Sequence, residues 1–538
     1  MEQAEPQSAP EPAPPSRGRW LVALAAVVAA LVLPLLLVDV PPILDYPNHL
    51  ARLYVLAFGP ADPALSRMYA PHWRILPNLA IDLLGPPLMH LFPVHVAGRM
   101  LLAGAMLLPL AGSMALHRAL FGRRSYWPLA AGLCAVNGLF LLGFVNFLWG
   151  VGIAMLGAAA WIATRRRSFA ATLAVGVGAA ILAFLCHLFG AALFAILVGS
   201  QELARLWRLR REGRLDVRAL LATAALLTAI ALPLAVLYLA SPLEHAHSAM
   251  RFSTAIRKVE QLFVPFLTYS KPLGLITGGL VAGAVILLRR RFAWDLGALI
   301  ALVILLLAYL AVPFAAKSGS FIDVRLPVMM AFLLFAAGEP RLSPRTGVIV
   351  AAGVAALLLV RTGFIAQAWV DHRSDLADFR ATIAAVPPGA KVMVVSADPA
   401  AYPDYARHEP RERVVPSLYR TDRHLAALLV IERRAFWPLM FADPTQQPLV
   451  VRAPYDRIAF PLGEPVDYRA LLTPRPSAYA LGLAPYLRDW RGDFDYVLLL
   501  DAGAIDAAKV RPDAMRLVAS SDIAALYRVR RPVGMGGA

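Results

Sequence analysis

The chain has 538 residues, of which 59% are hydrophobic and only 16% are charged. This composition excludes an ordinary soluble globular protein and indicates an integral membrane protein with many spans. The formal net charge of +17 would suggest a nucleic-acid partner in a soluble chain, but the basic residues here form short clusters between apolar runs, as cytoplasmic loops do. No basic patch is interleaved with aromatic residues, so we expect no nucleic-acid binding.

The N-terminal end predicts a tail followed by a retained span. Residues 1–18 are rich in Pro, Ala and Glu, which is typical of a disordered cytoplasmic tail. Residues 20–38 are apolar and long enough to span, and no small-residue cleavage site follows them, which argues against a signal peptide. Cys134 and Cys186 both lie in apolar runs, so no disulfide framework is expected.

Arginine clusters separate the later apolar runs and predict how the chain crosses the membrane. If every cluster faces the cytoplasm, an even number of crossings separates each neighbouring pair. The stretch 75–95, which is rich in proline, must then lie along the outer surface without crossing, and 168–205 must form two spans that turn near His187. The predicted spans number about eleven: 20–38, 97–116, 126–143, 145–164, 168–185, 188–205, 219–240, 272–289, 294–314, 325–338 and 346–364.

This count predicts two domains. An α-helical polytopic domain covers residues 19–365, with its N-terminus inside and outer loops at 39–96, 241–271 and 315–325. Residues 366–538 then form an extracytoplasmic α/β domain, because strand patterns alternate there with helical patterns. The strands are expected at 391–396, 495–500 and 523–529, and the helices at 376–386 and 424–433. This domain shows no glycine-rich phosphate loop, metal-ligand spacing or nucleophile elbow, so we assign it no chemistry.

The first outer loop carries the strongest candidates for catalysis. Ionisable groups at a membrane surface cost desolvation unless they bind or react. Asp45 and Asp39 are candidate bases, although Asp45 could equally cap a helix. His49 lies four residues after Asp45 and would share its helical face. The candidate phosphate or substrate contacts in this loop are Arg52, His72 and Arg74.

The other outer segments supply more cations. A lipid phosphate at the bilayer surface would suit basic side chains there, although a solvated amphipathic loop is the plainer interpretation of 241–271. Glu244 and His247 could ligate a divalent metal if helical, but two ligands alone are a weak signal. Arg325 could instead snorkel from a helix end, and His187 could be purely structural. The remaining candidates for phosphate binding are His187, Arg251, Arg257, Lys258, Lys271, Lys317 and Arg325.

One span, a long outer loop with an early acidic residue, a multi-span core and an outer α/β domain together resemble the GT-C superfamily of polytopic glycosyltransferases. The local match is the segment Asp45-Tyr-Pro-Asn-His-Leu-Ala, which looks like the acidic first-loop motif of that superfamily. The resemblance implies a polyprenyl-phosphate sugar donor, Asp45 as the base for an acceptor hydroxyl, and outer basic residues on the donor phosphate. Many members carry an adjacent acidic pair here, whereas Asp39 and Asp45 are six residues apart.

We therefore expect a glycosyltransferase that acts on the outer face of a bacterial inner membrane, with membrane lipids as its surroundings and a glycan, lipid or protein as acceptor. In that case Asp45 and the second and third outer loops should line one cavity. The alternatives are a cell-envelope polysaccharide polymerase or ligase, a membrane acyltransferase, a transporter or flippase, and a non-enzymatic scaffold. Few midplane charges and no internal repeat count against a transporter.

Overall fold

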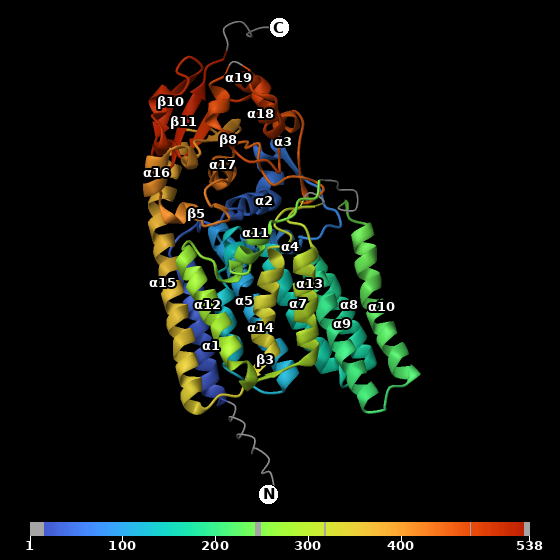
Figure 1. The fold of residues 1–538 in the computed structure, drawn as a ribbon. Coiled ribbons are helices and arrows are strands. Elements are labelled where there is room, and N and C mark those ends of the chain that lie inside the picture. The colour runs from blue at the N-terminus through green and yellow to red at the C-terminus, as the bar shows by residue number, and fades with distance from the viewer. Residues whose placement is uncertain (1–14, 243–248, 317–318, 474, 532–538) are drawn as a thin grey trace.

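The computed structural model describes residues 15–242, 249–316, 319–473 and 475–531. Figure 1 shows a bundle of long helices with an α/β layer on one end, and the last strands of the chain lie at the end opposite the start of the first helix. The predicted fold class, a polytopic helical domain with a C-terminal α/β region, is confirmed. The candidate metal ligands Glu244 and His247 and the candidate phosphate contact Lys317 lie outside the described residues.

Within the described residues, eight helices are long and apolar enough to cross a membrane. Three shorter apolar helices, Trp127–Leu141, Leu296–Ala311 and Arg325–Ala337, occupy the other positions where spans were predicted. The predicted turn near His187 is confirmed, because α8 ends at Cys186 and α9 begins at Leu188. The eight long helices are Arg17–Leu36, Val94–Phe121, Val145–Arg165, Phe169–Cys186, Leu188–Arg211, Val217–Leu239, Lys271–Arg291 and Pro344–Ile383.

Helices α5 (Val94–Phe121) and α7 (Val145–Arg165) form the centre of the bundle. A Cβ atom on Gly152 would lie 2.5 Å from the Leu108 backbone, so this glycine lets the two helices approach closely. Around them pack α8 (Phe169–Cys186), α9 (Leu188–Arg211), α13 (Leu296–Ala311) and α14 (Arg325–Ala337). Helix α10 (Val217–Leu239) stands at the edge and exposes Leu220, Leu221, Leu232 and Leu239, as a lipid-facing helix does (Figure 1).

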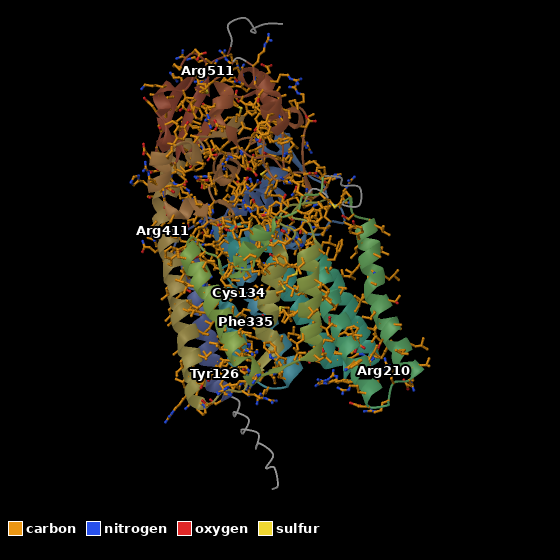
Figure 2. All side chains as sticks on the ribbon, viewed as in Figure 1. Tyr126, Cys134, Arg210, Phe335, Arg411 and Arg511 are labelled. Atoms are coloured by element: carbon orange, nitrogen blue, oxygen red, sulfur yellow. The ribbon has the colours of Figure 1, made fainter. Side chains whose placement is uncertain are left out.

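The predicted arginine clusters meet at one end of the bundle. The indole of Trp20 donates to the Ser125 carbonyl, and Arg123 pairs with Glu339 at 3.1 Å. Strands β2 (Phe292–Trp294) and β3 (Gly338–Pro340) pair at this end. Figure 2 places Arg210 here and Arg411 and Arg511 toward the opposite end. One face of the membrane domain is therefore strongly basic.

Short helices of the first outer loop cover the other end of the bundle. Helix α2 (Tyr46–Phe58) begins directly after Asp45, with Pro47 in its first turn, where a missing N–H costs nothing. Helix α4 (Ala80–Leu91) has only twelve residues and contains Pro86 and Pro87. Its length is well below the ~20 residues that a span requires.

The last long helix joins the two domains without a break. Helix α15 runs from Pro344 to Ile383, so the domain boundary predicted at residue 365 falls inside it. The helix predicted at 376–386 is the upper end of α15 because the apolar and amphipathic patterns follow each other in one helical register. Nothing in α15 separates a membrane part from an outer part.

Beyond α15, a five-stranded mixed sheet has the order β10-β11-β9-β4-β8. Strands β4 (Val392–Ser396), β9 (Tyr496–Leu500) and β11 (Ala524–Val529) coincide with the three predicted strands. Strand β4 runs parallel to β9 and β8 (Val466–Asp467), and β11 is antiparallel to β9 and β10 (Met515–Ser520). Helix α17 (Leu428–Arg433) forms the end of the helical pattern predicted at 424–433.

The C-terminal domain is docked on the first outer loop. The Asn48 amide donates to the Leu439 carbonyl at 3.0 Å and accepts from the Phe441 N–H at 2.7 Å. Strand β1 (Tyr69–Pro71) pairs with β7 (Leu449–Val451) in antiparallel register. These backbone contacts place residues of the outer domain directly over α2.

Two of the long helices are α1 (Arg17–Val32) and α12 (Lys271–Leu288). The remaining short elements are α3 (Leu65–Met68), α6 (Gly138–Leu141), α11 (Ala255–Gln261), β5 (Val414–Val415), β6 (Tyr419–Arg420), α16 (Pro403–His408), α18 (Ala478–Leu483) and α19 (Trp490–Asp493).

Candidate active site

Asp45 is held by the turn that precedes α7. The backbone N–H groups of Leu44 and Asp45 donate to the carbonyls of Leu141 and Leu142. Gly143 follows with φ +90°, and a Cβ there would lie 2.7 Å from the Asp45 Cβ. Only glycine tolerates both that backbone angle and that approach. The carboxylate is therefore placed by the backbone of two distant segments.

The acidic group at Asp45 has a partner from the C-terminal domain. His424 Nδ1 lies 2.9 Å from Asp45 Oδ1, without the alignment of a directed hydrogen bond. The Asp45 side chain is 17% exposed and that of His424 is 8% exposed. Asp45 makes no side-chain cap bond to α2, so helix capping does not account for it. Within the described residues its second oxygen has no hydrogen-bond partner.

His49 and Arg52 lie next to each other on α2, in the first turns after Asp45. Arg52 binds Asp82 of α4 through two nitrogens, at 2.7 and 3.2 Å, and is 2% exposed. Its third nitrogen lies 3.1 Å from His49 Nδ1. An arginine can only donate, so His49 Nδ1 must accept and the imidazole must be neutral. The guanidinium of Arg52 is thus committed to protein groups.

The electrostatics of this cluster agree with that assignment. Burial lowers the pKa of His49 well below its usual value of 6.5, and the neighbouring Arg52 and His424 lower it further. Burial raises the pKa of Asp82, while Arg52 opposes that shift. His49 therefore supports the Arg52–Asp82 pair as a neutral acceptor.

Arg325 reaches the neighbourhood of Asp45 from the membrane domain. Its guanidinium lies 4.9 Å from the centre of the Phe144 ring and 5.2 Å from that of Phe189. Phe144 follows Gly143, which abuts Asp45. The Nε of Arg325 is buried and makes no hydrogen bond to any described residue. His187 packs against the same Phe189 ring and accepts its backbone N–H, so it caps α9.

A cavity of about 440 Å³ lies between α11, the first turns of α12 and the loop before α14. The predicted cations Arg251, Arg257 and Lys271 line it. Its apolar walls include Phe252, Leu275, Phe314 and Phe321, and its rim on the C-terminal domain includes Leu418 and Tyr419. The predicted gathering of the second and third outer loops is therefore present.

Asp45 itself is not among the residues that line this cavity. The Phe144 ring, next to Gly143, lies 5.9 Å from the ring of Phe321, which does line it. The aromatic pair of Phe144 and Phe321 therefore separates the carboxylate from the cationic cavity.

Four other predicted site residues lie elsewhere. Lys258 donates to the Tyr309 carbonyl at 2.6 Å and pairs with Asp323, so it closes the end of α13. Asp39 is half exposed and faces Arg380 at 3.4 Å. His72 is tied by its backbone to Pro448, and Arg74 is exposed.

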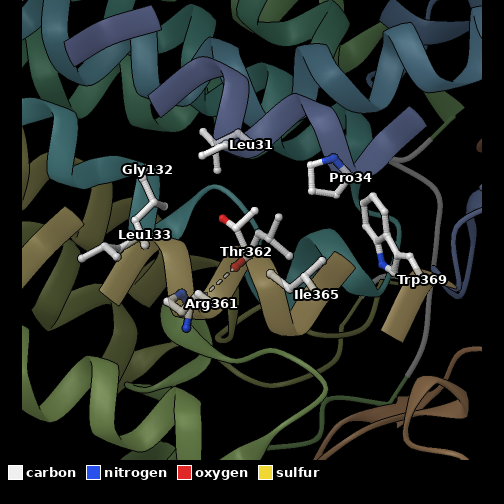
Figure 3. Close-up of a pocket in the computed structure, with 11 residues that line it drawn as sticks. Leu31, Pro34, Gly132, Leu133, Arg361, Thr362, Ile365 and Trp369 are labelled. Atoms are coloured by element: carbon white, nitrogen blue, oxygen red, sulfur yellow. Dashed lines mark hydrogen bonds between the residues drawn. The ribbon is translucent and has the colours of Figure 1, made fainter. Parts of the chain in front are cut away.

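The described residues offer two further negative observations. A smaller crevice between α1, the 3₁₀ helix η3 (Trp127–Cys134) and α15 holds only about 10 Å³ and is lined by Leu31, Pro34, Ile365 and Trp369 (Figure 3). It has room for about one water, so it is not a substrate site. In the described ranges, no three His, Cys, Asp or Glu side chains gather as a metal site would require.

Two site residues escaped the sequence analysis. His424 and Tyr419 belong to the C-terminal domain, to which the sequence assigned no chemistry. Burial raises the pKa of the Tyr419 phenol, and its bond to Glu464 raises it further. No short spacing links either residue to Asp45. Identifying these two residues requires an alignment of related sequences or a structure in which the two domains are in contact.

The neutral state of His49 predicts an acid-sensitive fold. Below pH 6.5 the unfolded chain binds a proton at this imidazole that the folded chain excludes, so stability falls as pH decreases. The loss has an upper limit of about 1.4 kcal/mol per pH unit for one group. Thermal unfolding in detergent between pH 7.5 and 5 should show a shallower acid-side decline in His49→Gln than in the wild type.

The matched control is His408→Gln, since His408 is exposed on the C-terminal domain. Its decline should follow that of the wild type. An unchanged slope in His49→Gln would contradict the assignment.

Two solved structures match the chain over nearly its whole length. ArnT from Cupriavidus metallidurans bound to undecaprenyl phosphate is 14% identical, with a TM-score of 0.50, and the match covers 95% of this chain and 98% of that chain. The same protein in the apo state is 13% identical, with a TM-score of 0.52 and coverage of 95% and 97%. No protein-family model matches the chain, and the search of curated proteins found no significant match.

At this level of identity the likeness establishes the fold. The architecture expected from the sequence, many apolar helices followed by an α/β region, is therefore the one that ArnT has. The chain is a multi-pass membrane protein with the fold of ArnT.

Proposed function

We propose that this protein is a membrane glycosyltransferase that moves a sugar from a polyprenyl-phosphate donor to an acceptor hydroxyl, with Asp45 as the base. The observation that carries the proposal is the position of Asp45. Its carboxylate is fixed where the two domains meet, and its second oxygen has no hydrogen-bond partner among the described residues. The buried Arg325 packs on the Phe144 ring next to Gly143, and a cationic, apolar-walled cavity lies beyond the ring of Phe321.

The chemistry requires a base and a place for the departing phosphate. The acceptor hydroxyl oxygen attacks the anomeric carbon and gives its proton to Asp45. The bond between that carbon and the phosphate oxygen breaks, and its electron pair leaves on the lipid phosphate. The anomeric configuration is inverted because attack and departure occur on opposite faces.

The cavity suits an amphiphilic phosphate. Arg251, Arg257 and Lys271 supply positive charge, while Phe252 and Leu275 supply apolar surface that suits a prenyl chain. Arg325 adds a buried cation on the Phe144 ring, and its Nε has no hydrogen-bond partner among the described residues. ArnT, which has the same fold, has been solved with undecaprenyl phosphate bound. This supports a ligand of that class.

The orientation follows from the charge distribution. The arginine-rich end of the bundle faces the cytoplasm by the positive-inside rule, so the C-terminal domain and Asp45 lie on the outer face of a bacterial inner membrane. A prenyl donor reaches that face through the bilayer, so no nucleotide pocket is needed. A glycan, lipid or protein then supplies the acceptor.

Impermeant labelling of introduced cysteines tests the orientation. Arg407→Cys on the C-terminal domain should react with a membrane-impermeant maleimide on intact spheroplasts, and Arg210→Cys should react only after lysis, because the two exposed positions lie at opposite ends of the molecule. Labelling of the second variant alone in intact cells would reverse the topology and remove the proposed function.

Asp45→Asn tests the chemistry. The amide keeps the shape of the side chain but cannot take a proton, so kcat should fall by at least about 10²-fold. The assay screens purified protein against a panel of undecaprenyl-phosphate-linked sugars and measures sugar release and transfer. Native mass spectrometry should find undecaprenyl phosphate retained by the variant.

Asp39→Asn serves as the comparison, because that carboxylate faces Arg380 away from the site. If Asp45→Asn stays fully active, the base is misassigned. Lipid flux through vesicles without any sugar transfer would favour a flippase.

Cavity variants test the donor site. Arg257→Ala and Lys271→Ala should each raise the donor KM by about tenfold, because each removes one charge-assisted contact to phosphate. Arg290→Ala, at the other end of the bundle, is the matched control. A donor KM unchanged in both cavity variants would move the phosphate site away from this cavity.

A further inference from the structure

We propose that His424 of the C-terminal domain is the positioning residue for Asp45, so that the outer domain completes the active site. The inference rests on the proposed function, in which Asp45 is the base. It assigns a defined role to a domain whose sequence carries no recognisable motif of its own.

The contact itself is specific. His424 Nδ1 lies 2.9 Å from Asp45 Oδ1, and Asp45 is the only charged partner of that nitrogen within the described residues. The His424 side chain is 8% exposed. A buried donor held beside one carboxylate oxygen leaves the other oxygen to meet an acceptor hydroxyl.

The ring has little freedom to turn. It meets Trp437 edge-to-face at 5.9 Å and Phe441 at 5.2 Å. Phe441 is fixed in turn, because its N–H donates to the Asn48 amide at 2.7 Å. The same α2 helix that follows Asp45 therefore sets the angle of the imidazole.

The backbone before His424 is anchored by a buried ion-pair network. Arg420 Nε donates to Asp422 at 3.1 Å, and its Nη2 donates to Asp501 at 2.6 Å. Asp501 also accepts the Ser396 hydroxyl, at the end of strand β4. The sheet of the outer domain thus holds the segment that carries His424, and rigid support of this kind is what a positioning group requires.

The imperfect alignment of the pair is expected without substrate, because catalytic hydrogen bonds often tighten only in the complex. In the complex, the Nδ1–H donates to Asp45 Oδ1 and fixes the plane of the carboxylate. The acceptor proton then moves to Oδ2, and His424 neither gains nor loses a proton. The opposite arrangement, in which Asp45 orients His424 and Nε2 takes the proton, makes different predictions.

Three substitutions separate these roles. In His424→Asn the amide nitrogen occupies the place of Nδ1, in His424→Gln it occupies that of Nε2, and His424→Phe keeps the packing on Trp437 and Phe441 without a donor. The readouts are kcat, the donor KM and thermal unfolding, measured on the full chain with the undecaprenyl-phosphate sugar that the wild type uses.

His424→Asn should keep kcat within about tenfold of the wild type, whereas His424→Phe and His424→Gln should lower it by about 10²-fold, the usual cost of a misplaced catalytic group. The donor KM should stay within about twofold in all three, because the donor contacts lie in the cavity. In an Asp45→Asn background, His424→Phe should have no further effect.

The matched control is His408→Phe, at the exposed end of α16 in the same domain, which should behave as the wild type. Full activity in a folded His424→Phe variant, beside an inactive Asp45→Asn, would overturn this inference alone. Equal loss in His424→Asn and His424→Phe at unchanged stability would make His424 the base and also overturn it. Full activity in Asp45→Asn would remove the proposed base and this inference with it.

Discussion

The buried amide of Asn48 is the contact on which the arrangement of this protein depends. Its nitrogen donates to the Leu439 carbonyl and its oxygen accepts from the Phe441 N–H. These are the two hydrogen bonds that a neighbouring strand would make to this segment of the C-terminal domain. Loss of that amide would leave two buried backbone groups without partners, which costs about 1–3 kcal/mol each. Because Asn48 lies one turn from Asp45, the same contact that joins the domains also sets the surroundings of the carboxylate.

The second constraint is a stretch of irregular backbone inside the bundle. Between η3 and α7 the chain makes short helical turns, and Asn137 caps one of them. Arg361 of α15 is 2% exposed and donates to the carbonyls of Phe266 and Val136, which regular helices would have satisfied internally. Such backbone is tolerated at membrane depth only when protein groups complete its hydrogen bonds. The irregularity brings Leu142 and Gly143 against Asp45.

Much of the fold was predictable from the sequence, because hydropathy and charge patterns depend on residues that are close together in the chain. The parity of the arginine clusters placed every apolar helix, including the break at His187, and β-branched runs gave three strands of the sheet. The spacing of Asp45 and His49 predicted that the two would share a helical face. His424 could not be found this way, because its contact with Asp45 spans almost the whole chain and depends on how two domains dock. Asp39 lies away from Asp45 because the chain turns between the two residues. The hydrophobic periodicity of the sequence does not predict that turn.

Helix α15 has a mechanical consequence. Forty residues without a break extend about 60 Å, roughly twice the thickness of the hydrocarbon layer. Because the helix is unbroken, the part that lies in the lipid and the part that leads to the C-terminal sheet move together. A bilayer of different thickness would tilt such a helix, so we expect the height of the C-terminal sheet above the membrane to follow the thickness of the lipid.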